Sequence, residues 1–227
     1  MFGKKKEVKE VSPLPDASNE QAEVIKWIQE GYNVLVDSVA GSGKTTLSLL
    51  IAKNYEKQIL LLTYNASLKT ETRDKAKAHK LRNLEVHNYH ACAVKYYQRG
   101  TFTDQKLKKI LDEDMYMDED WRATHFDLII IDEAQDMSPL YFEFVCKFIR
   151  DTNHNTSTQI CILGDKYQCI YRHINDSDER FISLADKTFT LNDKEWKEVK
   201  LSISFRMNHE TAQFVNKCML GYNRINT

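Results

Sequence analysis

The sequence has 227 residues, of which 42% are hydrophobic and 29% charged, a balance typical of a soluble globular protein. Its formal net charge is −1, so any binding of nucleic acid has to come from local basic patches. The five cysteines show no C-x-x-C spacing, which argues against a zinc site or a disulfide framework. No apolar run is long enough to span a membrane, and no signal peptide is visible. We therefore expect an intracellular protein without a membrane partner, in either the nucleus or the cytoplasm.

The amino-terminal region combines a charged tail with a capped helix. Residues 1–15 alternate Lys and Glu before two prolines, a pattern that predicts a flexible tail. Ser18 and Gln21 have the spacing of a helix-capping box. The apolar side of this helix is expected to consist of Ala22, Ile25, Trp27 and Ile28. Gln21 has two possible roles: it caps the helix, or it reads the adenine edge of a nucleotide, since it lies shortly before the segment considered next.

A strand, a turn of small residues and a helix follow one another around residues 34–52. The run Val34-Leu35-Val36 predicts a buried strand, and residues 47–52 predict a helix. The turn between them leads into Gly43-Lys44-Thr45, which is typical of a phosphate-binding loop, although Ser38 stands where the usual pattern has Gly. The residues expected to hold the phosphates are Ala40, Gly41, Ser42, Gly43, Lys44, Thr45 and Thr46.

The chemistry of this loop follows from the end of a helix. Backbone N–H groups at a helix N-terminus attract anions, and glycines at positions 41 and 43 let the backbone approach the phosphates. Lys44 is expected to contact the β- and γ-phosphates, and the Thr45 hydroxyl to ligate Mg²⁺.

Two acids follow the most apolar segment of the sequence. Residues 127–131 predict a buried parallel strand that ends on Asp132 and Glu133, where open α/β sheets bind ligands. Asp132 is expected to hold Mg²⁺, and Glu133 to act as general base toward the attacking water. A later strand, residues 159–165, also ends on an acid, and Gln168 beyond it is placed to sense a γ-phosphate.

The remaining segments are expected to be helices and strands without catalytic groups. Residues 67–80 form the most basic segment, either a solvated helix face or a contact to a phosphate backbone. Residues 101–125 are acidic and expected to be helical, as part of a small insertion at about 91–125. Further strands are expected at 58–63, 84–87 and 199–203, and further helices after His90 through Tyr97, at 139–150 and at 210–220.

Several of these segments match one family in order. Asn19–Gln21 resembles the adenine-reading Q motif, Val39–Thr46 motif I, and Asp132–Asp136 (DEAQD) motif II of superfamily 1 DNA helicases of the UvrD/Rep type. Gly164–Tyr171 resembles motif III, with Lys166 in place of Pro, and Ser204–Arg206 resembles motif IV. The resemblance runs from residue 16 to the C-terminus and is closest to the F-box DNA helicases and their viral relatives.

The resemblance implies further site residues. By its motif IV match, Phe205 stacks on adenine and Arg206 reaches the γ-phosphate. The segments similar to motifs Ia, Ib and III imply contacts to single-stranded DNA from Tyr64, Asn65, Asn88, Tyr89, His90, Tyr171 and His173. Asn88 stands where the family has Thr, and His173 where it has an aromatic residue that stacks on a base.

Together these features predict an α/β fold for residues 16–227, a RecA-like domain with a mostly parallel sheet and helices on both faces. The resemblance implies the ATP-binding half of an ATP-dependent DNA helicase that moves along single-stranded DNA and opens duplex junctions. It also implies a second RecA-like domain, absent from this sequence, so this chain alone is expected to hydrolyse ATP poorly. The alternative is a module that binds nucleotide or DNA without turnover and acts through protein partners.

Overall fold

A computed structural model describes residues 12–152, 158–169, 177–178 and 180–227. The strands are β1 (Asn33–Ser38), β2 (Ile59–Thr63), β3 (Leu84–Asn88), β4 (Leu128–Asp132), β5 (Gln159–Gly164) and β6 (Trp196–Leu201). The α-helices are α1 (Asn19–Gln29), α2 (Lys44–Asn54), α3 (Ala66–Ala78), α4 (Tyr89–Tyr96), α5 (Asp104–Asp112), α6 (Pro139–Thr152), α8 (Arg180–Ser183), α9 (Ala185–Thr188) and α10 (His209–Phe214). Short 3-10 turns lie at Glu119–Trp121, Ala134–Asp136 and Lys166–Gln168, and a π-helix at Val215–Leu220 follows α10.

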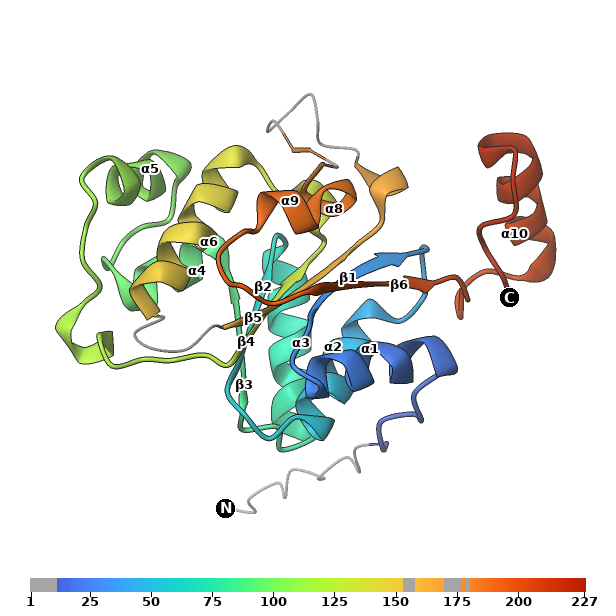
Figure 1. The fold of residues 1–227 in the computed structure, drawn as a ribbon, viewed down its shortest axis with the longest axis horizontal. Helices are drawn as coiled ribbons and strands as arrows, with labels where there is room; N and C mark the ends of the chain where they lie inside the picture. The colour runs from blue at the N-terminus through green and yellow to red at the C-terminus, as the bar shows by residue number, and fades with distance from the viewer. Residues whose placement is uncertain (1–11, 153–157, 170–176, 179) are drawn as a thin grey trace, which may run out of the picture.

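The six strands form one sheet in the order β3-β2-β4-β5-β1-β6, and every pair is parallel. Their carboxyl ends therefore meet at one edge of the sheet (Figure 1). At this edge Thr63 of β2 lies opposite Asp132 of β4, and Asp37 of β1 lies opposite Gly164 of β5.

Alternate residues of the central strands feed two hydrophobic cores, one on each face of the sheet. Ile129 and Ile131 of β4 join a core with α4, α5, α6, α8 and α9, whereas Leu128 and Ile130 join a core with α1, α2 and α3. Figure 1 shows these two helical layers on opposite sides of the strands. The near-continuous apolar strands fit a parallel sheet that is covered on both faces. The predicted α/β fold is thus confirmed.

The acidic segment is less helical than the sequence predicted. Of residues 101–125, only α5 and the turn at Glu119–Trp121 are helical. The helix stops because Asp114 takes a left-handed conformation (φ 42°), where its carboxylate accepts a bond of 2.7 Å from Lys147 Nζ of α6. Clustered acids at a helix C-terminus also oppose the helix dipole.

The last segment lies at the carboxyl edge of the sheet. Figure 1 shows α10 beyond the end of β6, away from both helical layers. The chain then turns back, so that Asn226 pairs through its backbone with Ser202 and Ser204, each bond being 2.8 Å long. In the part of the chain that the structure describes, no helix has the length and apolarity needed to cross a membrane.

Candidate nucleotide-binding site

The loop between β1 and α2 forms a cradle that only glycine permits. Gly41 and Gly43 have φ angles of 76° and 83°, in the left-handed region. A Cβ on Gly41 would lie 2.6 Å from Arg206 Cβ and 2.9 Å from Ser204 Oγ. One on Gly43 would lie 3.1 Å from Gln21 Nε2. The backbone is therefore packed closely against the segment after β6 on one side and α1 on the other.

The N-terminus of α2 is open to an anion. Its N-cap, Gly43, provides no side-chain hydrogen bond to the first turn, which carries Thr45 and Thr46. The Ser42 hydroxyl is buried and has no hydrogen-bond partner among the groups that the structure describes. Unpaired donors at the start of a helix are the usual phosphate-binding arrangement.

Lys44 spans the gap between the loop and the acids that follow β4. Its Nζ atom lies 3.3 Å from Glu133 Oε2, although β5 separates β1 from β4 in the sheet. The lysine side chain is 10% exposed and the glutamate side chain 25%. The expected phosphate contact and the expected general base thus lie within contact distance of each other.

The two acids differ in environment. Asp132 is 2% exposed, and burial together with the neighbouring Glu133 charge raises its pKa to about 7, although Lys44 acts in the opposite direction. Glu133 has φ 54°, an unusual conformation for a residue other than glycine. Gln135 Nε2 donates to Glu133 Oε2 at 2.9 Å and orients the carboxylate. Backbone strain of this kind is typical of functional sites.

The donor atoms fit Mg²⁺ bound together with a nucleotide. No group of three or more His, Cys, Asp or Glu side chains among the described residues could hold a metal without other ligands. Mg²⁺ usually takes one or two protein oxygens, and phosphate and water oxygens complete its shell. Thr45 and Asp132 would supply such oxygens, one from a hydroxyl and one from a buried carboxylate, so their chemistry suits this ion.

The loop after β5 is joined to the acids. Gln168 Nε2 donates to Asp165 Oδ2 at 2.8 Å, and the Asp165 N–H donates to Gln135 Oε1 at 3.1 Å. Gly164 leaves room for this contact, because a Cβ there would lie 2.7 Å from Gln135 Oε1. The predicted γ-phosphate sensor is therefore tied through Asp165 and Gln135 to Glu133.

Gln21, Phe205 and Arg206 lie beside the glycines of the phosphate loop. Ser18 and Gln21 form the predicted capping box, and Gln21 Nε2 also donates to Ser42 O at 3.3 Å, so the structural role is confirmed and adenine reading stays a prediction. Phe205 is 65% exposed, and its backbone N–H donates to Gly41 O at 3.0 Å. Its ring lies 3.7 Å from where a Cβ on Gly43 would be. Arg206 is exposed beside Gly41.

The predicted DNA contacts lie at the carboxyl ends of β2 and β3, where several have other roles. Asn65 caps α3 and Asn88 caps α4, through bonds from Ser67 N (2.7 Å) and Ala91 N (2.9 Å). Tyr64 packs edge-on against Tyr141. The predicted positions Tyr171 and His173 lie outside the described residues.

Tyr89 requires a correction. It is 2% exposed and its ring stacks on Tyr141 with centroids 4.6 Å apart, so it belongs to the core and cannot contact DNA from this position. The periodicity of α4 places its side chain inward. His90, next to it, is partly exposed and its Nε2 atom lies 3.0 Å from Asp104 Oδ1.

Two residues that contact the site were assigned no role from the sequence. Ser204, matched only as the first residue of the motif IV segment, donates through Oγ to Ala40 O at 2.8 Å, and Arg224 reaches the ends of β1 and β5. Serine and arginine are common surface residues, so only their position in the fold makes them noticeable. Gln135, within the DEAQD segment, could have been assigned a role from the motif itself.

The family model described as "AAA domain" matches residues 21–173, more than half of the chain. The chain belongs to the AAA domain family. The matched span contains the phosphate loop, the acids after β4 and Gln168. No curated protein sequence is significantly similar to this chain.

Solved structures share the fold at low sequence identity. Unliganded Pif1 from Bacteroides sp. superposes with a TM-score of 0.52 at 18% identity, over 89% of this chain and 45% of that one. A structure described as showing DNA unwinding at forked duplex DNA by two coordinating Pif1 helicases has a TM-score of 0.55 at 17% identity, covering 89% and 48%. Bacteroides sp. Pif1 in complex with ADP-AlF4 has a TM-score of 0.51 at 16% identity, covering 88% and 45%. The AAA domain family chain thus spans about half the length of these helicases.

Proposed function

We propose that this AAA domain chain is the ATP-binding half of an ATP-dependent DNA helicase or translocase of superfamily 1. The observation that carries the proposal is the 3.3 Å contact between Lys44 Nζ, at the start of α2, and the Glu133 carboxylate after β4. A glycine cradle, a lysine and two acids close together are the set of groups that phosphoryl transfer needs. The likeness of the fold to Pif1 structures further supports the proposal.

The residues divide the work in a specific way. The N–H groups of the loop and Lys44 bind the phosphates, while Phe205 and Gln21 flank the base. When nucleotide binds, Lys44 exchanges its contact with Glu133 for phosphate oxygens and leaves the carboxylate to accept a proton from the attacking water. Bound Mg²⁺, held by Thr45 and Asp132, would neutralise phosphate charge. Gln168 and Arg206 are the further residues proposed to contact the γ-phosphate.

We place the DNA along the carboxyl ends of β2 and β3, where Tyr64, Asn65, Asn88 and His90 lie. Single-stranded DNA and duplex junctions are the proposed partners, since Pif1 structures of similar fold include one bound to single-stranded DNA and one that describes DNA unwinding at forked duplex DNA. The motifs follow one another in the order of the superfamily 1 DNA helicases, with DEAQD directly after β4. This order supports our assignment of the chain to the UvrD/Rep type and to the F-box helicase branch. The proposed complete motor contains a second RecA-like domain that closes on this one and works inside the cell.

The test is ATP hydrolysis with and without single-stranded DNA, measured on this chain and on any longer product of the same gene. We expect weak turnover by this chain, because an arginine supplied by a neighbouring domain can contribute about 10³–10⁵ in rate. DNA-stimulated turnover by the longer product would support a helicase motor. Nucleotide binding without turnover in both proteins would support instead the module that acts through partners.

A further inference from the structure

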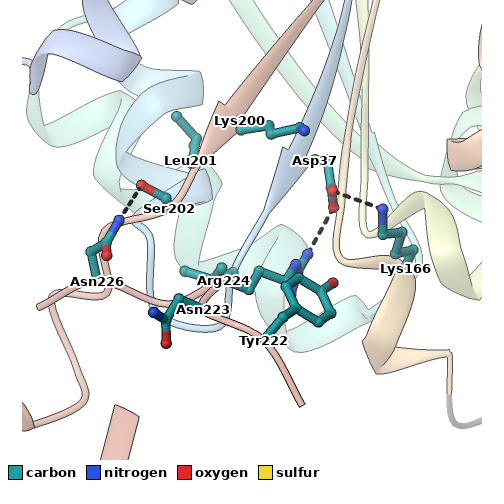
Figure 2. A pocket seen from close by; sticks show the side chains of 10 residues that line it. Asp37, Lys166, Lys200, Leu201, Ser202, Tyr222, Asn223, Arg224 and Asn226 are labelled. Carbon is teal, nitrogen blue, oxygen red and sulfur yellow. Dashed lines mark hydrogen bonds and ion pairs between the residues drawn. The ribbon is translucent and has the colours of Figure 1, made fainter. Parts of the chain in front are cut away.

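Arg224 connects two buried acids, Asp37 and Asp165, at the carboxyl edge of the sheet. Figure 2 shows its contact with Asp37. Its Nη2 atom lies 2.8 Å from Asp37 Oδ1, and its Nη1 atom lies 2.9 Å from Asp165 Oδ1. The arginine side chain is 10% exposed, and the two carboxylates 8% and 3%. Lys166, which stands where motif III of the superfamily 1 DNA helicases has a proline, completes the cluster with its Nζ atom 3.3 Å from Asp37 Oδ2. Charges this well buried interact strongly, because water screens them little.

The backbone around Arg224 is held in place by the C-terminal segment itself. Asn216 of the π-helix accepts bonds from the N–H groups of Arg224 (3.1 Å) and Ile225 (3.0 Å), and donates to Ile225 O at 2.8 Å. The guanidinium also lies over the Tyr167 ring, 4.7 Å from its centroid. The bonds to Asn216 and the contact with the Tyr167 ring therefore direct the arginine side chain at the acids, unlike a flexible surface side chain.

The two acids belong to the two segments that the proposed function needs. Asp37 immediately precedes Ser38, whose hydroxyl donates to Gly164 O at 2.8 Å where the phosphate loop begins. Asp165 divides its oxygens: Oδ1 binds Arg224 and the Tyr167 N–H, while Oδ2 accepts from Gln168 Nε2 at 2.8 Å. The position of the Gln168 amide thus depends on an aspartate that Arg224 holds.

We propose that Arg224 is a positioning residue that aligns the γ-phosphate sensor with the phosphate loop. This inference rests on the proposed function, in which Gln168 approaches the γ-phosphate. Without the guanidinium, Asp37 would keep its contact with Lys166, whereas the buried Asp165 would lose its ion pair with Arg224. Repulsion between the two carboxylates would then displace Asp165 together with Gln168. A lysine at position 224 keeps the charge but lacks the planar fork that reaches both acids at once.

The experiment compares a nucleotide that has a γ-phosphate with one that lacks it. Titration calorimetry gives the affinities of Mg²⁺-AMP-PNP and Mg²⁺-ADP for the wild-type chain and for Arg224→Gln. We expect Arg224→Gln to weaken AMP-PNP binding about fivefold or more, a usual size for coupling between sites, and to leave ADP binding within about twofold. Arg224→Lys should lose part of the AMP-PNP affinity.

Two further variants separate positioning from simple loss of stability. Asn226→Ala removes the bond from Asn226 Nδ2 to Ser202 Oγ in the same segment but leaves the acids paired, so both affinities should be unchanged. Gln168→Ala should reproduce the selective loss, and combining it with Arg224→Gln or Arg224→Lys should add little, since residues that act through one another are not additive.

The outcomes are distinct. The positioning role would be overturned, while the nucleotide site stands, if Arg224→Gln weakened AMP-PNP and ADP binding equally. It would also be overturned if Arg224→Lys kept the wild-type ratio of AMP-PNP to ADP affinity, or if the losses of AMP-PNP affinity in Arg224→Gln and Gln168→Ala were additive. If the wild-type chain binds neither nucleotide, the proposed function itself fails.

Discussion

The carboxyl ends of β1 and β4 differ from those of β2 and β3 in what their polar side chains contact. At β1 and β4, Lys44 contacts Glu133, and the buried Ser42 hydroxyl has no hydrogen-bond partner among the described groups. At β2 and β3, Asn65 and Asn88 cap the helices that follow them, and Tyr89 packs in the core.

This difference separates motif matches that the fold itself explains from motif matches that require a ligand. At the nucleotide edge Lys44 contacts another matched residue, Glu133, and the Ser42 hydroxyl has no partner among the described groups, so folding alone does not explain why these side chains are there. At the DNA edge the caps and the core account for three matched positions without any ligand. The nucleotide site is therefore the firmer part of the account, and the following changes test the contrast from the largest expected effect to the smallest.

Glu133→Gln should retain affinity for Mg²⁺-ATP but lower hydrolysis about 10²–10⁴-fold, which is the usual contribution of a general base. The amide has nearly the same shape as the carboxylate but cannot accept the proton from water. Single-turnover hydrolysis with excess protein measures the effect on this chain. The exposed Glu143 of α6 provides the matched control, and Glu143→Gln should change nothing. Normal hydrolysis by Glu133→Gln would place the base elsewhere.

Tyr89→Ala should lower the free energy of unfolding by about 3–5 kcal/mol, as expected when a large buried aromatic side chain is removed. Tyr89→Phe should change it by less than about 1 kcal/mol, because the Tyr89 hydroxyl is buried without a hydrogen-bond partner among the described residues. Urea unfolding measures both. If Tyr89→Phe lost much of its free energy of unfolding and also bound DNA more weakly, the Tyr89 hydroxyl would have a role in DNA binding after all.

Lys44→Ala should weaken Mg²⁺-ATP binding about 10- to 100-fold, since a charge-assisted hydrogen bond to phosphate contributes about 1.5–3 kcal/mol. Competition against a fluorescent nucleotide measures the loss. Lys53→Ala, in the last turn of the same helix and exposed, is the control and should bind normally. Equal affinity in the two variants would remove Lys44 from the phosphate site.

Asn88→Ala should destabilise the fold by about 1 kcal/mol through loss of the α4 cap, whereas Asn88→Asp, an equally good cap, should restore stability. Thermal unfolding measures the difference. If Asn88→Ala kept full stability but lost affinity for single-stranded DNA, the side chain would serve the ligand rather than the helix.

The sequence predicts best where local pattern and burial agree. The apolar run at 127–131 correctly predicted β4, because such a run suits only a strand that is covered on both faces. The face of α1 was partly wrong: Ala22 is exposed and Val24 is buried, since the capping box turns Gln21 inward and rotates the stripe. Arg224 was out of reach, because its partner Asp37 lies 187 residues away along the chain. Long-range pairs of this kind have no local signature.

Hydrogen–deuterium exchange of this chain with and without Mg²⁺-ATP tests the central claim most directly. The account predicts slower exchange of backbone amides in Val39–Thr46, with smaller protection around Asp132–Asp136 and Phe205. Amides at Asn65 and Asn88 should be unchanged, because no nucleotide contact is placed there. Protection at the ends of β2 and β3 with none in the phosphate loop, or no protection at saturating nucleotide, would contradict it.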